Sequence, residues 1–197
     1  MIETPHGPAR VHVRPFEGDA RAVLVLGHGA GGGVDAPDLR AATRAAEAER
    51  VHVVLVEQPY RVAGRRSPAP AAQLDAAWVA VLDELPRQGL PLIAGGRSSG
   101  ARVACRTASA TGAAGVLCLA FPLHPPGRAD VSRVDELKQV TVPVLVVQGR
   151  TDPFGMPRSS GNRKVVRVPG DHSLKAGLPE VERAVAVWLA DLVRFGT

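Results

Sequence analysis

Short apolar runs, most of them rich in β-branched residues, alternate with alanine-rich stretches of helical spacing along almost the whole chain. This alternation is typical of βα units, in which helices cover both faces of a parallel sheet and its strands become almost wholly apolar. Strands are predicted at Arg10 to Arg14, Ala22 to Leu26, Val51 to Val56, Leu92 to Ala94, Val116 to Leu119, Val144 to Gln148 and Val165 to Val168. Helices are predicted at Asp38 to Glu49, Ala71 to Leu85, Ser99 to Ala110 and Pro179 to Val193. The pattern predicts an α/β fold with a mainly parallel central sheet and helices on both faces.

The 197 residues, of which 45% are hydrophobic, suffice for one core, so we expect a single domain over residues 1–197. Two cysteines are too few for the disulfide framework of a small secreted protein. The first residues lack the basic start and apolar core of a secretory signal, and no apolar run approaches the roughly 18 residues of a membrane span. We therefore expect a cytoplasmic protein without a membrane partner.

The basic excess, 24 Lys and Arg against 19 Asp and Glu, points at first to nucleic-acid binding. The arginines are scattered, however, and the four Phe, two Trp and one Tyr are too dispersed for a base-stacking surface. We interpret the charge as solvated surface and expect no nucleic-acid partner. Cys105 and Cys118 lie in apolar segments outside any CxxC pair, so we expect small buried hydrophobes and no metal site.

The predicted strand at Leu92 to Ala94 runs into Gly-Arg-Ser-Ser-Gly at residues 96–100 and then into an alanine-rich helix. A Gly-x-Ser-x-Gly sequence between strand and helix is typical of a nucleophile elbow, in which the glycines leave room for a strained serine. Only Ser98 lies midway between Gly96 and Gly100. The alternative is a phosphate-binding turn at a helix N-terminus, but the segment lacks the P-loop lysine and is not GxGxxG. The motif favours Ser98 as a nucleophile.

A serine nucleophile needs a base and an acid that orients the base, and in this context they follow in the order Ser, Asp or Glu, His. Asp152 lies just beyond the predicted strand Val144 to Gln148, and His172 lies in the loop after the next strand. Asp171 adjoins the histidine, but neighbouring loop side chains rarely face each other, so a local turn is the ordinary interpretation. The order and spacing favour Asp152 as the orienting acid and His172 as the base.

The strand ending near Leu26 breaks into the glycine-rich segment 27–33. Such a loop can supply one backbone donor of an oxyanion hole, and the residue after the nucleophile supplies the other. We expect the two donors to be the amides of Ala30 and Ser99. The alternative is a flexible connector to the helix that begins near Asp38.

These segments together resemble the α/β-hydrolase superfamily, most nearly a short branch related to dienelactone hydrolases. The resemblance rests on residues 27–32, 95–100, 121–127, 148–155 and 170–175. It implies a Ser98, His172 and Asp152 triad, no metal or organic cofactor, and hydrolysis of an acyl bond through an acyl-enzyme. Dienelactone hydrolases usually carry cysteine where this chain has Ser98, so the resemblance does not extend to lactone chemistry. About thirty residues separate the strand ending near Leu119 from Asp152, too few for a helical cap domain, which predicts an open cleft.

The sequence therefore predicts a serine hydrolase that cleaves a small carboxylic ester or thioester. The residues expected to contact this small-molecule substrate are His28, Tyr60, Arg65, Arg97 and His124. The segment from Tyr60 to Arg66 follows a strand end, and its arginines either offer a guanidinium to an anionic substrate or are solvated or paired with Glu57. The rival hypothesis is a non-catalytic scaffold of the same fold that binds a protein partner. The pattern carries no information on oligomeric state.

Overall fold

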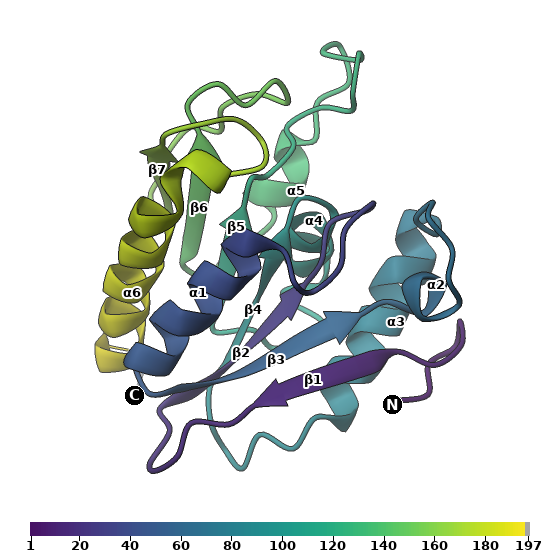
Figure 1. The fold of residues 1–197 in the computed structure, drawn as a ribbon, viewed down its shortest axis with the longest axis vertical. Helices are drawn as coiled ribbons and strands as arrows, with labels where there is room; N and C mark the ends of the chain where they lie inside the picture. The colour runs from purple at the N-terminus through teal and green to yellow at the C-terminus, as the bar shows by residue number, and fades with distance from the viewer. Residues whose placement is uncertain (196–197) are drawn as a thin grey trace.

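A computed structural model describes residues 1–195 as a seven-stranded sheet with helices on both faces (Figure 1). The strand order across the sheet is β1-β3-β2-β4-β5-β6-β7. Only β1 runs antiparallel to its neighbour, β3. The strands are β1 (Arg10–Arg14), β2 (Ala22–Gly27), β3 (Val51–Glu57), β4 (Leu92–Arg97), β5 (Gly115–Leu119), β6 (Val144–Gly149) and β7 (Arg163–Val168). The predicted fold class is confirmed.

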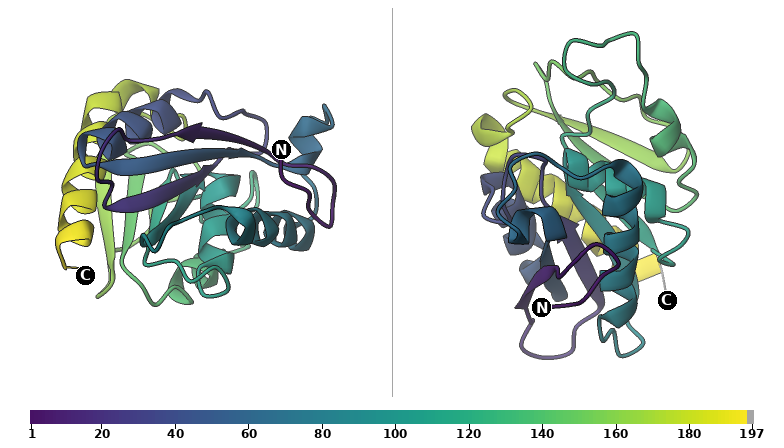
Figure 2. Two further views of the ribbon diagram at one scale, coloured as in Figure 1. Left: turned by 90° about the horizontal axis from the view of Figure 1, so that it is seen from below. Right: turned by 90° about the vertical axis from the view of Figure 1, so that its right-hand side faces the viewer.

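Two apolar layers hold the helices against the sheet, one on each face. On one face α1 (Pro37–Ala48) and α6 (Leu178–Phe195) lie side by side, and their apolar residues share a core with residues such as Leu24 and Leu117. On the other face α3 (Ala71–Glu84), α4 (Ser99–Thr107) and α5 (Val134–Lys138) pack over residues such as Val25 and Val116 (Figure 2). The central strands β2, β5 and β6 are buried along their whole length, which explains their uniformly apolar sequences.

All seven predicted strands and four predicted helices are present, with ends displaced by at most three residues. The strand β4 runs on to Arg97 because its glycines are packing residues: a Cβ on Gly95 would approach the Leu117 carbonyl of β5. Three short elements were missed, namely α2 (Pro59–Val62), α5 and a 3-10 turn at Lys175–Gly177. One or two turns are too few for a helical period to show in the sequence.

The parallel strands bring the candidate site residues to one edge of the sheet. Gly27 at the end of β2 pairs with Gly96 of β4, and Gly149 at the end of β6 pairs with Val168 of β7. The loops that follow these ends carry the glycine-rich segment, the elbow serine, Asp152 and His172. Ligands of open α/β sheets bind beyond the carboxyl ends of the strands, so this edge is where a site is expected.

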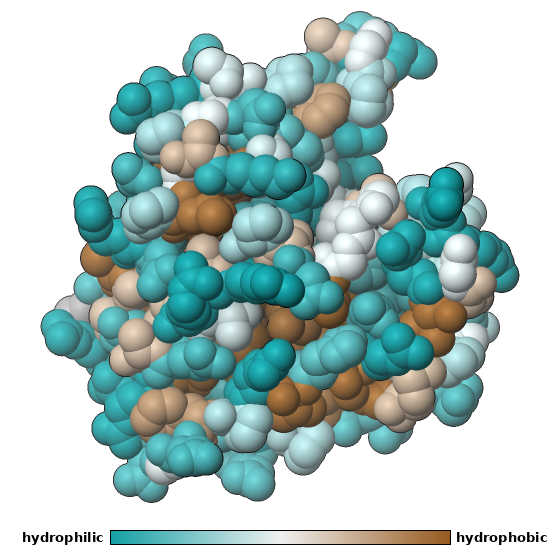
Figure 3. All heavy atoms as spheres, viewed as in Figure 1, coloured by the Kyte–Doolittle hydropathy of each residue, from teal (hydrophilic) through white to brown (hydrophobic). Residues whose placement is uncertain are grey.

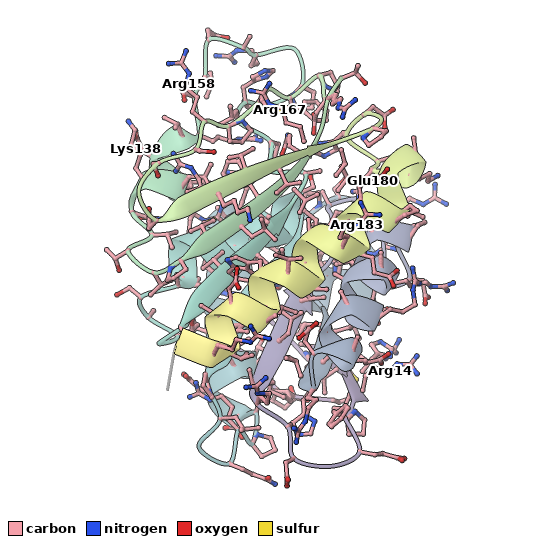
Figure 4. All side chains as sticks on the ribbon, turned by 90° about the vertical axis from the view of Figure 1, so that its left-hand side faces the viewer. Arg14, Lys138, Arg158, Arg167, Glu180 and Arg183 are labelled. Carbon is pink, nitrogen blue, oxygen red and sulfur yellow. The ribbon has the colours of Figure 1, made fainter. Side chains whose placement is uncertain are left out.

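Residues 1–195 include no cap domain over this edge, as predicted. Between β5 and β6 lie an irregular segment and the five-residue helix α5. Among residues 1–195 no helix is long and apolar enough to span a membrane. The labelled basic side chains Arg14, Lys138, Arg158, Arg167 and Arg183 are spread over one side of the molecule and do not gather in one patch (Figure 4).

Candidate active site

Ser98 is the single residue between the end of β4 and the start of α4. Its backbone has φ 52° and ψ −105°, in the region that non-glycine residues rarely adopt. The Ser98 N–H donates to the Leu119 carbonyl oxygen at 2.9 Å, which fixes the turn against β5. This strained strand-to-helix turn is the conformation expected of a nucleophile elbow.

The two glycines of the motif are required by the close approach of β2. A Cβ on Gly96 would lie 2.5 Å from the carbonyl oxygen of Gly27, and a Cβ on Gly100 would overlap the same group. Any side chain at either position would separate α4 from the sheet. The predicted reason for both glycines is therefore confirmed.

Ser98, His172 and Asp152 form a continuous chain of hydrogen bonds. His172 Nε2 lies 3.0 Å from Ser98 Oγ, and His172 Nδ1 lies 2.8 Å from Asp152 Oδ2. Because a carboxylate only accepts, Nδ1–H is the donor and Nε2 is left to accept the serine proton. The Asp152 side chain is fully buried, whereas 17% of the His172 side chain is exposed.

Both oxygens of Asp152 have further donors that hold the carboxylate in place. Gln148, a fully buried residue near the end of β6, donates its amide to Oδ2 at 2.8 Å and to the Phe121 carbonyl at 3.1 Å. The Phe154 N–H donates to Oδ1 at 2.8 Å. Sequence reasoning missed Gln148, although a polar residue in a wholly apolar strand was a signal for it.

Asp171 hydrogen-bonds the turn that follows the histidine. It is exposed, and its Oδ1 accepts the backbone N–H of Ser173 at 2.9 Å and the Ser173 hydroxyl at 2.7 Å. These bonds lower the pKa of Asp171. The carboxylate serves the local turn, as the sequence predicted.

Ala30 and Ser99, the predicted oxyanion donors, both line the cleft that contains Ser98. Among the residues that the structure describes, neither backbone N–H donates to a protein acceptor. The Ser99 amide opens α4, where the N–H groups of the first turn are unpaired and the helix dipole favours negative charge. Two backbone N–H groups without a protein acceptor therefore belong to residues that line the cleft beside Ser98.

His28 and Tyr60 stabilise the loop that carries Ala30 by hydrogen bonds to its backbone carbonyls. The His28 Nδ1–H donates to the Gly29 carbonyl at 2.8 Å, and its Nε2 accepts the Gln58 N–H at 3.1 Å. Burial lowers the pKa of His28, in keeping with a neutral ring. The Tyr60 hydroxyl donates to the Ala30 carbonyl at 2.8 Å, and burial raises its pKa to about 12. Both side chains are buried, and neither lines the cleft.

The remaining predicted substrate contacts also lie outside the cleft lining. Arg97 Nε pairs with the buried carboxylate of Asp38 at 2.9 Å, and a terminal nitrogen of the Arg97 guanidinium donates to the His172 carbonyl at 3.2 Å. Burial raises the pKa of Asp38, and the adjacent guanidinium opposes that shift. Arg65 is exposed and lines a different hollow beside α2, while His124 Nδ1 bonds the neighbouring Pro125 carbonyl.

The cleft itself measures about 320 Å³ and opens between the segment after β5 and the loop after α2. Figure 3 shows the surface hollowed on this side of the molecule. Its lining residues are Ala30, Pro68, Ser98, Ser99, Arg102, Pro122, Pro126, Arg133 and Phe154. The Phe154 ring meets the His172 imidazole edge to face at 4.5 Å. Sequence reasoning did not identify Phe154, Arg102 or Arg133.

Within the described part of the chain, no group of three or more His, Cys, Asp or Glu side chains is placed to hold a metal ion. Cys105 and Cys118 are buried free thiols, their sulfurs 3.5 Å apart between α4 and β5. The hydrogen bond with the Cys118 thiol, together with burial, raises the pKa of Cys105 well above its usual value. Their predicted place in the apolar core is confirmed.

Comparisons with known proteins agree with this architecture. A serine hydrolase homologue from Coxiella burnetii superposes with a TM-score of 0.79 at 20% identity, covering 96% of this chain and 95% of that one. A serine hydrolase without lid from Xanthomonas campestris gives 0.76 at 24% identity, covering 98% and 91%. A dienelactone hydrolase from Anabaena variabilis gives 0.75 at 17% identity, covering 96% and 94%. No curated protein sequence matches the chain.

A family model described as alpha/beta hydrolase domain matches residues 20–177. The matched region begins just before β2 and contains the elbow, Asp152 and His172. It covers most of the chain, and the solved structures share the fold over nearly the whole length. The chain therefore belongs to the alpha/beta hydrolase family.

Proposed function

We propose that the protein is a serine hydrolase that cleaves a small carboxylic ester or thioester through an acyl-enzyme. The observation that carries this proposal is the hydrogen-bonded chain from Ser98 Oγ through His172 to Asp152, with separations of 3.0 and 2.8 Å. These separations fall in the range in which a base takes the proton of a serine nucleophile. Membership of the alpha/beta hydrolase family also supports it, as do the similar structures from Coxiella burnetii and Xanthomonas campestris, both of which are named as serine hydrolases.

In the proposed acylation, His172 Nε2 accepts the Ser98 proton while Oγ attacks the carbonyl carbon. The negative charge that forms on the carbonyl oxygen accepts the Ala30 and Ser99 N–H groups. The tetrahedral intermediate collapses, the bond to the alcohol or thiol breaks, and the His172 proton passes to the leaving group. Asp152 keeps the imidazole in the required tautomer and stabilises its positive charge.

Deacylation repeats these steps with water. His172 takes a proton from a water molecule, whose oxygen attacks the acyl carbon of the Ser98 ester. The second tetrahedral intermediate uses the same backbone donors and releases the carboxylic acid while Ser98 regains its proton. The three side chains supply nucleophile, base and orienting acid, so the proposed route needs no cofactor.

The proposed substrate size follows from the cleft. A volume of about 320 Å³ is at the lower end of ordinary small-molecule sites. The prolines and Phe154 that line it offer apolar contact for a short acyl or alcohol group. With no cap domain to open, the ester carbonyl reaches Ser98 directly.

A fluorophosphonate probe tests the proposed nucleophile. The expected result is stoichiometric labelling of the wild-type protein at Ser98 and none of Ser98→Ala. Ser99→Ala is the matched control, because it removes the adjacent hydroxyl and keeps the backbone N–H, and it should label normally. A folded wild-type protein that does not label, or that hydrolyses p-nitrophenyl esters no faster than Ser98→Ala, would instead favour a non-catalytic scaffold.

A further inference from the structure

The charged side chains that line the cleft are both arginines. Arg102 lies one helical turn after Ser98 on α4, so the two share a helix face. Arg133 occupies the N-cap position of α5 and also lines the cleft. No carboxylate is among the lining residues. The local charge of the cleft wall is therefore positive.

Arg102 is already neutralised within the protein. Its Nε and a terminal nitrogen donate to the two oxygens of Glu136 at 2.8 and 2.6 Å. Glu136 also accepts from Arg106 at 3.2 Å, and Arg106 forms a two-pronged pair with Asp75. In this network two carboxylates balance two guanidinium groups, and all the side chains are largely buried.

Arg133 has no such partner. Within residues 1–195 its guanidinium makes no ion pair or hydrogen bond. Only its backbone is engaged: its N–H donates to the Leu123 carbonyl at 2.7 Å, and its carbonyl accepts the Glu136 N–H at 3.1 Å. Partial burial, together with the positive charges of Arg102 and Arg106, lowers its pKa, although Glu136 opposes this. A half-buried guanidinium without a partner is an unfavourable arrangement, which an anion in the cleft would relieve.

We infer that the ester substrate carries a carboxylate group and that Arg133 binds this group while Ser98 attacks the ester carbonyl. The inference rests on the proposed function, because it names the substrate class of the same site. A guanidinium presents parallel N–H donors that match the two oxygens of a carboxylate. The prolines and Phe154 between the two ends of the cleft would contact the apolar part of the molecule. Arg133 is thus assigned as a substrate-binding residue that determines specificity.

Two matched pairs of esters test the inference from either side of the scissile bond. On the alcohol side, 4-acetoxybenzoate is compared with its methyl ester, and on the acyl side monophenyl adipate is compared with phenyl hexanoate. The wild-type protein should favour the anionic member of at least one pair by about tenfold or more in kcat/KM, mostly through a lower KM, as expected for a charge-assisted contact. The preference should shrink as salt is raised.

Arg133→Gln should abolish this preference by lowering kcat/KM for the anionic esters far more than for the neutral esters, and Arg133→Lys should restore part of it. The matched control is Arg128→Gln, because Arg128 lies on the same loop, is exposed, pairs with Asp130 and does not line the cleft. An equal loss on charged and neutral esters in Arg133→Gln, or an equal preference in wild type and Arg133→Gln, would overturn the inference while leaving the serine hydrolase proposal standing.

A binding measurement separates this result from failure of the proposed function. Calorimetric titration with adipate and 4-hydroxybenzoate needs no turnover, and at least one should bind the wild-type protein about tenfold more tightly than Arg133→Gln. If no ester is hydrolysed and the fluorophosphonate does not react, the proposed function fails, and the titration alone decides whether Arg133 binds carboxylates. Equal or absent binding in both proteins would overturn the inference.

Discussion

The Nδ1 atom of His28 lies 2.8 Å from the carbonyl oxygen of Gly29. That carbonyl belongs to the peptide group whose other end is the Ala30 N–H, one of the two proposed oxyanion donors. Because the C=O and N–H of a trans peptide point in opposite directions, fixing the carbonyl also fixes the direction of the donor. We therefore propose that His28 is a positioning residue for the Ala30 donor of the proposed oxyanion hole and does not itself touch the substrate.

Replacing His28 with Phe should lower kcat for a neutral aryl ester by about 10- to 100-fold, with little change in KM, because the Ala30 donor loses its support. The variant also leaves the buried Gln58 N–H without an acceptor, which should cost about 1–3 kcal/mol of stability. Steady-state kinetics and chemical denaturation measure the two effects. A variant that is merely less stable, with an unchanged kcat at a temperature where it is folded, would contradict the positioning role.

The buried His28 also predicts how stability depends on pH. Burial lowers its folded-state pKa below the usual 6.5, so below that pH the unfolded chain binds more protons than the folded one. The contribution of this group is fully present at neutral pH and is lost as pH falls from about 6.5 toward the lowered pKa. Denaturation midpoints between pH 7.5 and 5 should therefore fall more steeply for wild type than for His28→Phe. Parallel curves would show that the pKa of His28 is the same in the folded and unfolded states.

Substitutions of the two candidate acids, Asp152 and Asp171, should have very different effects on kcat. Asp152→Asn should lower kcat by about 10³- to 10⁴-fold, because the amide carries no negative charge and its NH2 can donate to His172 Nδ1, which leaves the imidazole in the wrong tautomer. Asp171→Asn should change kcat by less than about threefold, since this exposed carboxylate serves only the Ser173 turn. Ester hydrolysis by the two variants decides the matter. Comparable losses in both would show that the orienting acid has been misassigned.

Close packing of β2 against α4 predicts a further stability difference. Gly96→Ala places a Cβ against the Gly27 carbonyl and should cost about 1–3 kcal/mol or more, as overpacking does. Gly33→Ala is the control, because a Cβ there has no atom within 4 Å. Its stability should change by less than about 0.5 kcal/mol, as at other open surface positions. Thermal unfolding of both proteins checks this, and similar midpoints would contradict the packing argument.

Much of the fold and of the candidate site could be predicted because the signals are local. Buried parallel strands must be apolar along their length, and the elbow glycines stand at fixed spacing around Ser98. Asp152 and His172 were found in the same way, since each follows directly on a strand end. Such residues are placed by topology, so their order in the sequence is sufficient to identify them.

The residues that were missed are placed by long-range packing. Arg133 and Phe154 reach the cleft from irregular segments whose path no periodicity describes, and Arg65, which follows a strand end, faces another hollow. His28 lies in the glycine-rich segment 27–33, and Arg97 directly precedes Ser98. Their partners Gln58 and Asp38, however, come from other parts of the chain. Sequence alone could not separate a residue that contacts substrate from one that supports the residues that do.

The central claim is that Ser98 forms an acyl-enzyme, and trapping that intermediate tests it most directly. The wild-type protein is mixed with excess p-nitrophenyl butyrate, quenched in acid within milliseconds to seconds, and mapped by peptide mass spectrometry. We predict a butyryl group on the peptide containing Ser98, formed in step with a burst of p-nitrophenolate, and its absence from Ser98→Ala but not from Ser99→Ala. Turnover of the ester without any acyl group on Ser98, or an equal burst in Ser98→Ala, would contradict the account.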